Sequence, residues 1–227
     1  MEKQEHHSPT SAHWHKPTDG EHRWPVTLIV LIVVVLQLML PKSLALSTQK
    51  YICAVEILLM VAMFAVNPKR ISKHVIQVRA LGIALAATMS LSNTVSVVLL
   101  IKALVTRGIT DAQSLLLTGG SIWITNIVIF ALWYWEMDRG GPGARAEALD
   151  PYPDFLFPQM SDPAYAPKDW SPSFFDYLYT SVTNGSAFSP TDVMPLTRPA
   201  KMLMVVQSTT ALVTVGLVIA RAVNILR

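Results

Sequence analysis

The residues with the clearest chemical pattern lie near the C-terminus, between residues 176 and 221. A short amphipathic stretch leads into a polar hairpin, and a long apolar stretch follows the hairpin. Irregular backbone is tolerated at membrane depth only where protein buries it or where water lines it. The pattern therefore predicts a re-entrant loop beside a polar pathway through a membrane. Four side chains of the hairpin are suited to attracting a cation: Ser186, Ser189, Thr191 and Asp192.

A second candidate site is Glu56, which lies inside an apolar stretch over residues 51–66. An ionisable side chain inside a membrane span is energetically expensive and is commonly functional. One hypothesis is therefore that Glu56 binds the coupling proton of a secondary transporter. The alternative is a structural role, in which the carboxyl group is protonated or hydrogen-bonded to Gln37 of the preceding apolar stretch.

Motifs of catalysis and of metal binding are missing from the sequence. There is no HExxH or GxSxG pattern, and no pair of acids lies beside a histidine within the apolar stretches. Imidazole suits zinc, copper and nickel, but no acidic or cysteine ligand stands at a binding spacing from the clustered histidines. We therefore expect no enzyme activity, no cofactor and no metal site. The clustered histidines are His6, His7, His13, His15 and His22.

Composition indicates the class of protein that carries these residues. Of the 227 residues, 52% are hydrophobic and only 15% are charged, whereas a typical soluble domain carries about 25% charged residues. Apolar runs close to the length of a bilayer span predict an integral membrane protein, with the lipid bilayer as its partner. Lys and Arg exceed Asp and Glu by only 18 to 15, so we expect no nucleic-acid partner. The single cysteine, Cys53, cannot form an intramolecular disulfide.

The apolar stretches predict an all-α membrane protein with about five transmembrane helices and a re-entrant helix and loop before the last span. The predicted spans cover residues 24–40, 51–66, 80–104, 115–135 and 199–224. A polar tail has too few apolar residues to fold, and prolines recur too often in the long loop for a regular helix. The chain thus divides into a disordered tail (1–23), a four-helix transmembrane region (24–136), a Pro/Gly-rich acidic extramembrane loop (137–171) and a pore-like hairpin with the last helix (172–227).

The helix of the hairpin is predicted over residues 173–184, between a start at Ser171-Pro172 and a stop at Gly185. At about 1.5 Å per residue it is roughly 18 Å long, well short of a hydrocarbon core of about 30 Å. It can therefore enter a membrane but cannot cross it. The last helix, at about 39 Å, is long enough to span a membrane with some tilt.

This part of the chain resembles the pore module of tetrameric potassium-type channels, which consists of a pore helix, a selectivity filter and an inner helix. The resemblance covers about a fifth of the chain. The pore-helix motif D-x-L-Y-x-S-V-x-T is similar to Asp176-Tyr177-Leu178-Tyr179 with Ser181-Val182-Thr183. After the filter, the matching positions are Asp192, Pro195, Thr197, Lys201 in place of the usual arginine, and Ile219-Ala220-Arg221 at the end of the inner helix.

The filter itself differs from that of the family. Where the family has T-V-G-Y-G, this chain has Ala187-Phe188-Ser189-Pro190-Thr191. Potassium selectivity uses rings of backbone carbonyls whose backbone angles need glycine, and Pro190 restricts both its own φ and that of Ser189. The resemblance therefore implies a homotetramer with a pathway for an inorganic cation, without the usual potassium selectivity. It assigns the pore and filter region to Ser186, Ala187, Phe188, Ser189, Pro190, Thr191 and Asp192.

Two signals give opposite orientations in the membrane. With five spans, the basic loop over residues 67–79 falls on the same side as the acidic loop. The positive-inside rule places the basic loop, and with it the pore loop, in the cytoplasm. The resembled channels have the pore loop outside, and Arg221 and Arg227 also favour a cytoplasmic C-terminus. Both orientations stay open, and the expected location is the plasma (inner) membrane.

Three functions are compatible with these residues. The favoured hypothesis is an ion channel or channel-like protein that conducts cations through a homotetramer. The second is a secondary transporter or permease with Glu56 as the coupling group, although such folds usually show repeats with broken helices and only one broken segment is visible here. The third is a non-conducting protein in which the pore-like loop packs as a plug.

Overall fold

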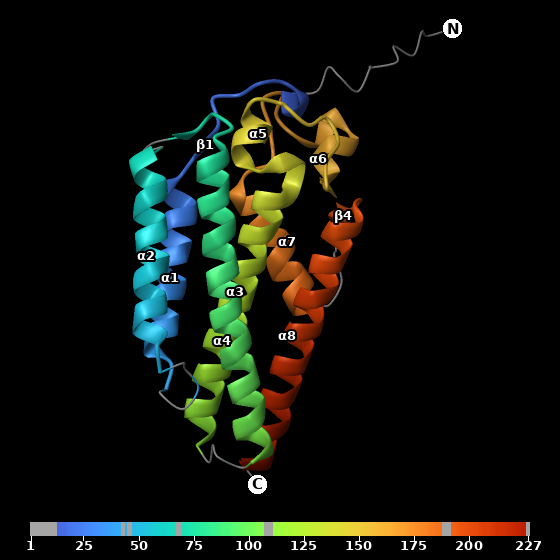
Figure 1. The fold of residues 1–227 in the computed structure, drawn as a ribbon. Coiled ribbons are helices and arrows are strands. Elements are labelled where there is room, and N and C mark those ends of the chain that lie inside the picture. Colours follow the sequence, from blue (N-terminus) through green and yellow to red (C-terminus); the bar gives the residue numbers. More distant parts are fainter. Residues whose placement is uncertain are drawn as a thin grey trace, which may run out of the picture.

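The computed structural model shows a mostly helical chain whose long helices run side by side (Figure 1). It describes residues 13–41, 44, 47–66, 70–106, 111–187 and 192–225. Four helices are long and apolar enough to cross a membrane, namely α2 (Gln49–Val66), α3 (Ile76–Val105), α4 (Ala112–Met137) with the turn after it, and α8 (Arg198–Ile225).

The prediction of an all-α protein is confirmed, and four apolar helices of spanning length support a membrane protein. The count of five full-length spans is not reached in the described residues, because α1 (Trp24–Met39) has only 16 residues. At about 1.5 Å per residue, α1 is roughly 24 Å long. It is apolar and packs beside α2 and α4, so it belongs to the same bundle.

Helix α4 is the centre of the bundle. It packs against α1, α3, α8 and the shorter helix α7 (Phe174–Ala187). In its most apolar stretch 67% of the residues are buried, against 22% for α2 and 28% for α8. The outward faces of α2 and α8 are apolar, as expected for helices that contact lipid or other protein copies. Asp111 caps the start of α4 by accepting a hydrogen bond from the Ser114 amide.

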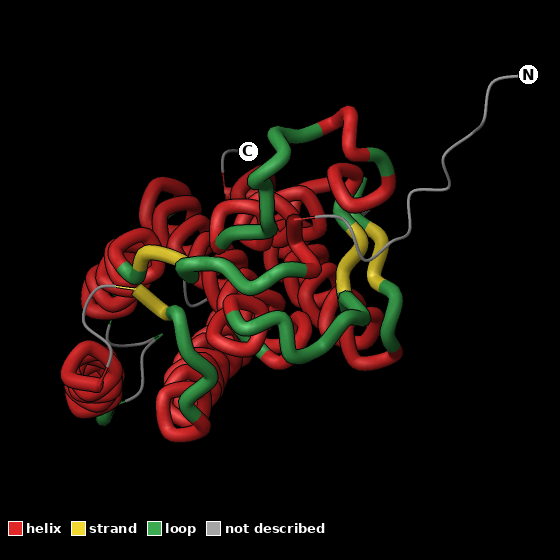
Figure 2. Tube along the Cα trace, turned by 90° about the horizontal axis from the view of Figure 1, so that it is seen from above, coloured by secondary structure: helices red, strands yellow, loops and turns green. Residues whose placement is uncertain are grey.

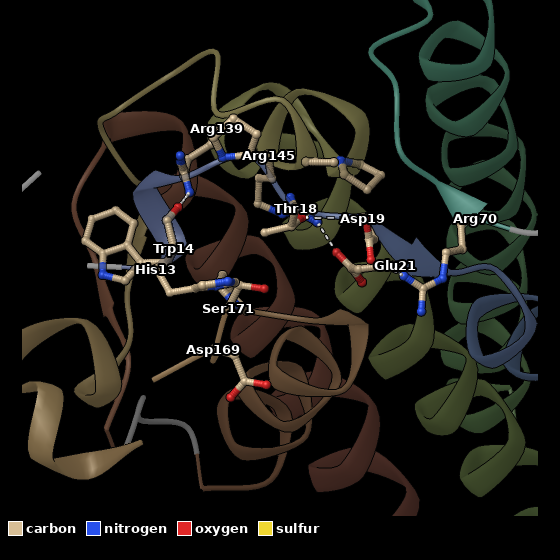
Figure 3. A pocket seen from close by; sticks show the side chains of 15 residues that line it. His13, Trp14, Thr18, Asp19, Glu21, Arg70, Arg139, Arg145, Asp169 and Ser171 are labelled. Atoms are coloured by element: carbon tan, nitrogen blue, oxygen red, sulfur yellow. Dashed lines mark hydrogen bonds and ion pairs between the residues drawn. The ribbon is translucent and has the colours of Figure 1, made fainter. Parts of the chain in front are cut away.

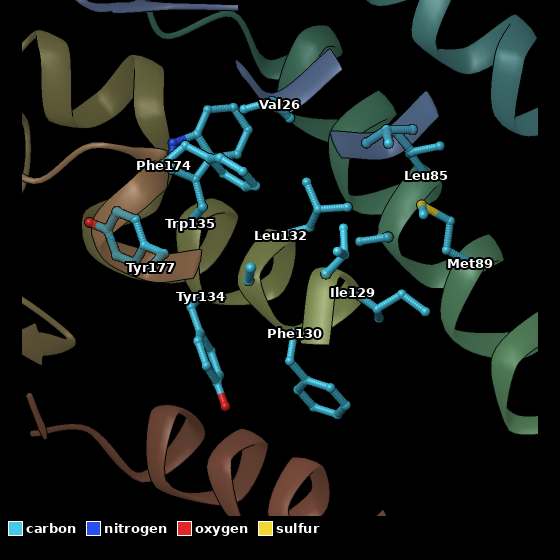
Figure 4. Close-up of a cluster of buried hydrophobic side chains, with 14 of the residues drawn as sticks. Val26, Leu85, Met89, Ile129, Phe130, Leu132, Tyr134, Trp135, Phe174 and Tyr177 are labelled. Atoms are coloured by element: carbon cyan, nitrogen blue, oxygen red, sulfur yellow. The ribbon is translucent and has the colours of Figure 1, made fainter. Parts of the chain in front are cut away.

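An aromatic core joins α4 to α7 (Figure 4). Trp135 and Tyr134 of α4 are fully buried, and the Trp135 ring meets Phe174 of α7 edge-on with the ring centroids 5.8 Å apart. Tyr134 packs against Phe155 with the centroids 4.9 Å apart. Aromatic contacts of this geometry add to the stabilisation that burial of the rings provides.

Residues 13–23, 138–173 and 192–197 build a cap over one end of the bundle, here called the cap end. Seen from this end, two short antiparallel strand pairs lie on opposite sides (Figure 2). Strand β1 (Glu21–His22) pairs with β2 (Arg70–Ile71), and β3 (Phe155–Leu156) pairs with β4 (Met194–Pro195). The other elements of the cap are short helices: η2 (His13–His15), η3 (Asp138–Gly140), α5 (Pro142–Ala146), α6 (Pro158–Ser161) and η4 (Pro163–Tyr165).

The described part of the predicted tail, residues 13–23, contains the short helix η2 and the strand β1. The tail alone cannot build a core, but two buried arginines of the long loop hold it. Arg139 Nη1 donates to the Trp14 carbonyl oxygen at 2.6 Å, and Arg145 Nη2 pairs with the Glu21 carboxylate at 3.1 Å. Amino-acid composition does not predict these contacts, because the two arginines lie more than a hundred residues away from the tail in the sequence.

The long loop folds over the bundle around Asp138. The Asp138 carboxylate accepts hydrogen bonds from the Tyr177 hydroxyl at 2.6 Å and from the amides of Asp154 and Phe155 at 2.7 and 3.2 Å. The basic loop lies at the same end, because the His74 amide donates to Glu147 at 2.9 Å. The two loops that the topology predicts on one side therefore do meet at the cap end.

Candidate functional site

Helix α7 starts at the cap end and runs antiparallel to the second half of α4. Its first residue, Phe174, packs against Trp135 near the end of α4. Roughly two turns before the end of α7, the Ser181 hydroxyl donates to the Ile127 carbonyl oxygen at 2.6 Å. Trp123, roughly four turns before the end of α4, donates its indole N–H to the Gly185 carbonyl oxygen at 3.3 Å. Helix α7 thus ends about halfway along α4.

Buried amides join this end of α7 to α8. Asn184 Nδ2 donates to Gln207 Oε1 at 2.8 Å and to the Met204 carbonyl oxygen at 3.0 Å. Gln207 Nε2 in turn donates to the Ser181 carbonyl oxygen at 2.9 Å and to the Ser181 hydroxyl oxygen at 2.6 Å. Gln207 and Ser181 are fully buried. We call Tyr134, Ser181, Asn184 and Gln207 the amide cluster.

Tyr134 completes the amide cluster from α4. Its ring extends away from Trp135 toward another helix (Figure 4), and its hydroxyl donates to Gln207 Oε1. Every polar group of the Gln207 amide therefore has a partner from α4 or α7. Because unpaired buried polar groups are costly, the cluster fixes the position of the α7 end in an otherwise apolar interior.

The sequence around α7 explains where the helix begins. Asp176 accepts hydrogen bonds from the Ser173 amide and hydroxyl, both at 2.8 Å, in the manner of a capping box. Glu21 of the ordered tail also accepts from the Phe174 amide at 2.8 Å. The cap is thus Ser173 rather than Ser171, although the predicted start is close to the observed one.

The predicted helix stop at Gly185 is wrong, because α7 continues to Ala187. A Cβ atom at Gly185 would lie 3.3 Å from Gln207 Nε2 and 3.3 Å from Ile127 Cγ1. The glycine therefore permits the close approach of α7 to α4 and α8 and does not end the helix.

After α7 the chain returns to the cap end. Of the predicted pore and filter residues, Ser186 is exposed in the last turn of α7 and Ala187 is its last residue. Asp192 is exposed, and its carboxylate accepts a hydrogen bond from the Tyr179 hydroxyl at 3.4 Å. The remaining predicted positions, Phe188, Ser189, Pro190 and Thr191, lie outside the described residues.

The segment between the hairpin and α8 is hydrogen-bonded to the long loop. The Leu196 amide donates to the Asp154 carbonyl oxygen at 2.8 Å, and the Thr197 hydroxyl donates to the Asp154 carboxylate at 2.5 Å. Together with the β3–β4 pair, these bonds place the start of α8 beside the start of α7. The hairpin thus leaves the cap end as α7 and comes back to it before α8 begins.

No family model, curated protein or solved structure matches this chain.

The second predicted site, Glu56, is fully buried between helices. Gln37 Nε2 of α1 donates to Glu56 Oε1 at 3.3 Å, which is the contact expected for a structural role. Gln49 Nε2 donates to Gln37 Oε1 at 2.7 Å and to Ser92 Oγ of α3 at 3.0 Å, so a chain of polar groups leads to the carboxyl group. Within the described residues, Glu56 Oε2 has no hydrogen-bond partner.

The histidines do not form a metal site in the part of the chain that the structure describes. No group of three or more His, Cys, Asp or Glu side chains there could hold a metal ion. His13 and His15 form η2, and His22 lies in β1. His6 and His7 are outside the described residues.

The sequence argument missed the amide cluster and Glu21. The sequence does contain a signal for the amide cluster. Gln207 is a strongly polar residue inside an apolar helix, and such residues commonly form hydrogen bonds to a neighbouring helix. Glu21 gives no such signal, since its partners Arg145 and Phe174 are distant in the sequence.

Replacing Gln207 with Leu is expected to destabilise the hairpin. The substitution keeps the volume roughly constant but removes the acceptor of the Tyr134 hydroxyl, one of the partners of Asn184 and the donor to the Ser181 carbonyl oxygen, at a cost of about 3 kcal/mol. We expect a lower melting temperature in detergent and faster amide hydrogen exchange in α7. Ser208→Ala at the neighbouring position serves as the control, because the described hydrogen bond of Ser208 stays within its own helix. Unchanged exchange in α7 of the Leu variant would contradict the role given to the cluster.

Proposed function

We propose that the protein is a channel-like membrane protein that conducts cations as a homotetramer, without the usual potassium selectivity. One observation carries the proposal: α7 ends halfway along α4, and the chain then returns to the end where α7 began. With 14 residues, α7 is about 21 Å long, against about 30 Å for a hydrocarbon core. A helix of this length and position enters a membrane without crossing it.

The end of α7 supports a site for a cation. The last carbonyl groups of a helix have no partner within the helix, and the helix dipole adds partial negative charge there. The Gly185 carbonyl oxygen accepts a hydrogen bond from the Trp123 indole. The exposed Ser186 hydroxyl is a further oxygen at this helix end that could contact a cation.

Uncovered faces on the hairpin support assembly into an oligomer. On α7, Phe175, Tyr179 and Val182 are exposed by 53, 52 and 39% and follow one another at helical spacing. On α8, Val205 and Leu212 are exposed by 55 and 54%. A homotetramer around α8 would bury both faces and bring four α7 ends to one axis, which is the arrangement of the channels that the hairpin resembles.

The composition of the hairpin supports a pathway that is not selective for potassium. The chain has no glycine between Ala187 and Asp192, and Pro190 restricts the backbone there. Carbonyl rings of the usual potassium filter need the backbone freedom of glycine. We therefore expect cations to be attracted by the oxygens of the hairpin and by Asp192, with little discrimination between potassium and sodium.

Neutralising Asp192 is expected to reduce cation conduction. In planar bilayers at about 0.01 M salt, Asp192→Asn should lower the single-channel conductance roughly twofold, and the difference should vanish near 1 M salt because ions screen the charge. Asp162→Asn is the matched control, since Asp162 is an exposed acid at the same end whose capping role Asn can replace. Four-fold particles that carry no current under any ion gradient would contradict conduction and favour the plugged form.

A transporter with Glu56 as coupling group is the second candidate, because the buried Glu56 carboxyl has one oxygen without a described partner. Such a group can exchange a proton. Glu56→Gln retains an acceptor for Gln37, so the protein should stay folded. In proteoliposomes with a proton gradient, loss of gradient-driven uptake in this variant would support the transporter. Unchanged uptake would exclude Glu56 from coupling.

A further inference from the structure

A large open pocket lies in the cap, away from the hairpin (Figure 3). Its volume is about 770 Å³, within the range of roughly 300 to 1,000 Å³ that small-molecule sites occupy. The walls come from the ordered tail, from the turn after α4 and from the segment before α7. None of these residues takes part in the amide cluster.

Two ion pairs neutralise most of the charge in the pocket wall. Arg145 pairs with Glu21 at 3.1 Å, and Arg70 pairs with Asp19 at 3.6 Å. The Arg145–Glu21 pair is almost fully buried, whereas Asp19 is 94% exposed. A ligand gains little from groups that already compensate each other.

One buried cation of the wall lacks a carboxylate partner. Arg139 is only 1% exposed, and its guanidinium donates to the carbonyl oxygens of Asp150 and Trp14 at 2.7 and 2.6 Å. Neither bond cancels the charge, and Nη2 has no hydrogen-bond partner within the described residues. Arg139 also has a φ of +51°, an unusual backbone angle for a non-glycine residue. Asp138 and Asp150 interact electrostatically with Arg139, so what this residue offers a ligand in the pocket is the unpaired Nη2 donor.

One carboxylate of the wall also lacks a partner. Asp169 is exposed, and no hydrogen bond or ion pair of its side chain exists within the described residues. Figure 3 shows Arg139 and Asp169 on opposite sides of the pocket, with Ser171 between them. The Ser171 hydroxyl is likewise without a described partner and is a free donor for an anionic oxygen.

The pocket lies beside the start of α1 and the end of α4. Trp24, the first residue of α1, is 60% exposed, and a tryptophan in such a place is typical of the membrane interface. The opening therefore lies near the depth of lipid head groups.

From the charge pattern we infer that the pocket binds a zwitterionic phosphate ester that carries a primary ammonium group. The phosphate lies toward Arg139 and Ser171, and the ammonium group lies toward Asp169. A purely anionic ligand would leave Asp169 facing negative charge, and a purely cationic one would leave Arg139 Nη2 without an acceptor. The same chemistry belongs to an ethanolamine lipid head group and to a free phosphoethanolamine ester.

The test uses the full-length, delipidated protein in a neutral detergent and follows the fluorescence of Trp14, with Trp14→Phe as the reporter control. The probes are dihexanoyl phosphatidylethanolamine, dihexanoyl phosphatidylglycerol and glycerophosphoethanolamine. We expect the ethanolamine lipid to bind roughly tenfold more tightly than the glycerol lipid. Glycerophosphoethanolamine that binds as tightly as the ethanolamine lipid identifies a free ester, and much weaker binding identifies the lipid.

Two variants test the assigned groups. Asp169→Asn should weaken binding of the ethanolamine lipid roughly threefold and should not weaken binding of the glycerol lipid, because it removes one exposed carboxylate that attracts ammonium and repels an anion. Ser171→Phe should fill the pocket and prevent binding of both. Asp111→Asn at the opposite end of the molecule is the matched control, since Asn caps a helix as well as Asp does. Equal affinities for the two lipids, or binding that Asp169→Asn and Ser171→Phe leave unchanged, would overturn the inference.

Discussion

A helix that ends inside an apolar bundle leaves polar groups that need partners at that depth. For α7 these partners are Gln207 of α8 and Tyr134 and Trp123 of α4. Each unpaired group would cost several kcal/mol in an environment without water. The amide cluster therefore determines where α7 can end.

The cap fixes the other end of the same helix. Glu21 accepts hydrogen bonds from the Phe174 amide and from the Trp135 indole, and Asp138 accepts one from Tyr177. Arg145 pairs with the Glu21 carboxylate and donates to the backbone carbonyl oxygens of Trp135 and Asp138. Helix α7 is thus held between a buried network of charges at the cap end and a buried network of amides in the bundle. The proposed pore depends on both.

Much of this architecture could be predicted from the sequence, because it follows from local patterns. The apolar stretches predict the long helices, and the short amphipathic stretch predicts α7 to within three residues at its end. The helix cap at Asp111 can also be predicted from the sequence, because a cap is a local feature. The same holds for the hydrogen bond between Gln37 and Glu56, because it joins consecutive helices.

The order of the cap could not be predicted in the same way. Residues 13–23 have the composition of a disordered tail, and only the distant Arg139 and Arg145 give them partners. The predicted helix stop at Gly185 is wrong for a similar reason, because the role of this glycine depends on the close approach of Ile127 and Gln207. Local composition carries no information about such partners, whereas the helices depend mainly on periodicity.

In the proposed arrangement, the hairpin enters and leaves the membrane on one side. Cys53 is the single cysteine and is buried, so a Cys53→Ser background allows single exposed positions to be labelled with a membrane-impermeant thiol reagent in sealed vesicles. The positions are Asp169→Cys before α7, Leu196→Cys after the hairpin and Asn224→Cys at the end of α8. If the hairpin enters and leaves on one side, positions 169 and 196 react from one side of the membrane and position 224 reacts from the other. Labelling of positions 169 and 196 from opposite sides would contradict it, because α7 would then cross the membrane.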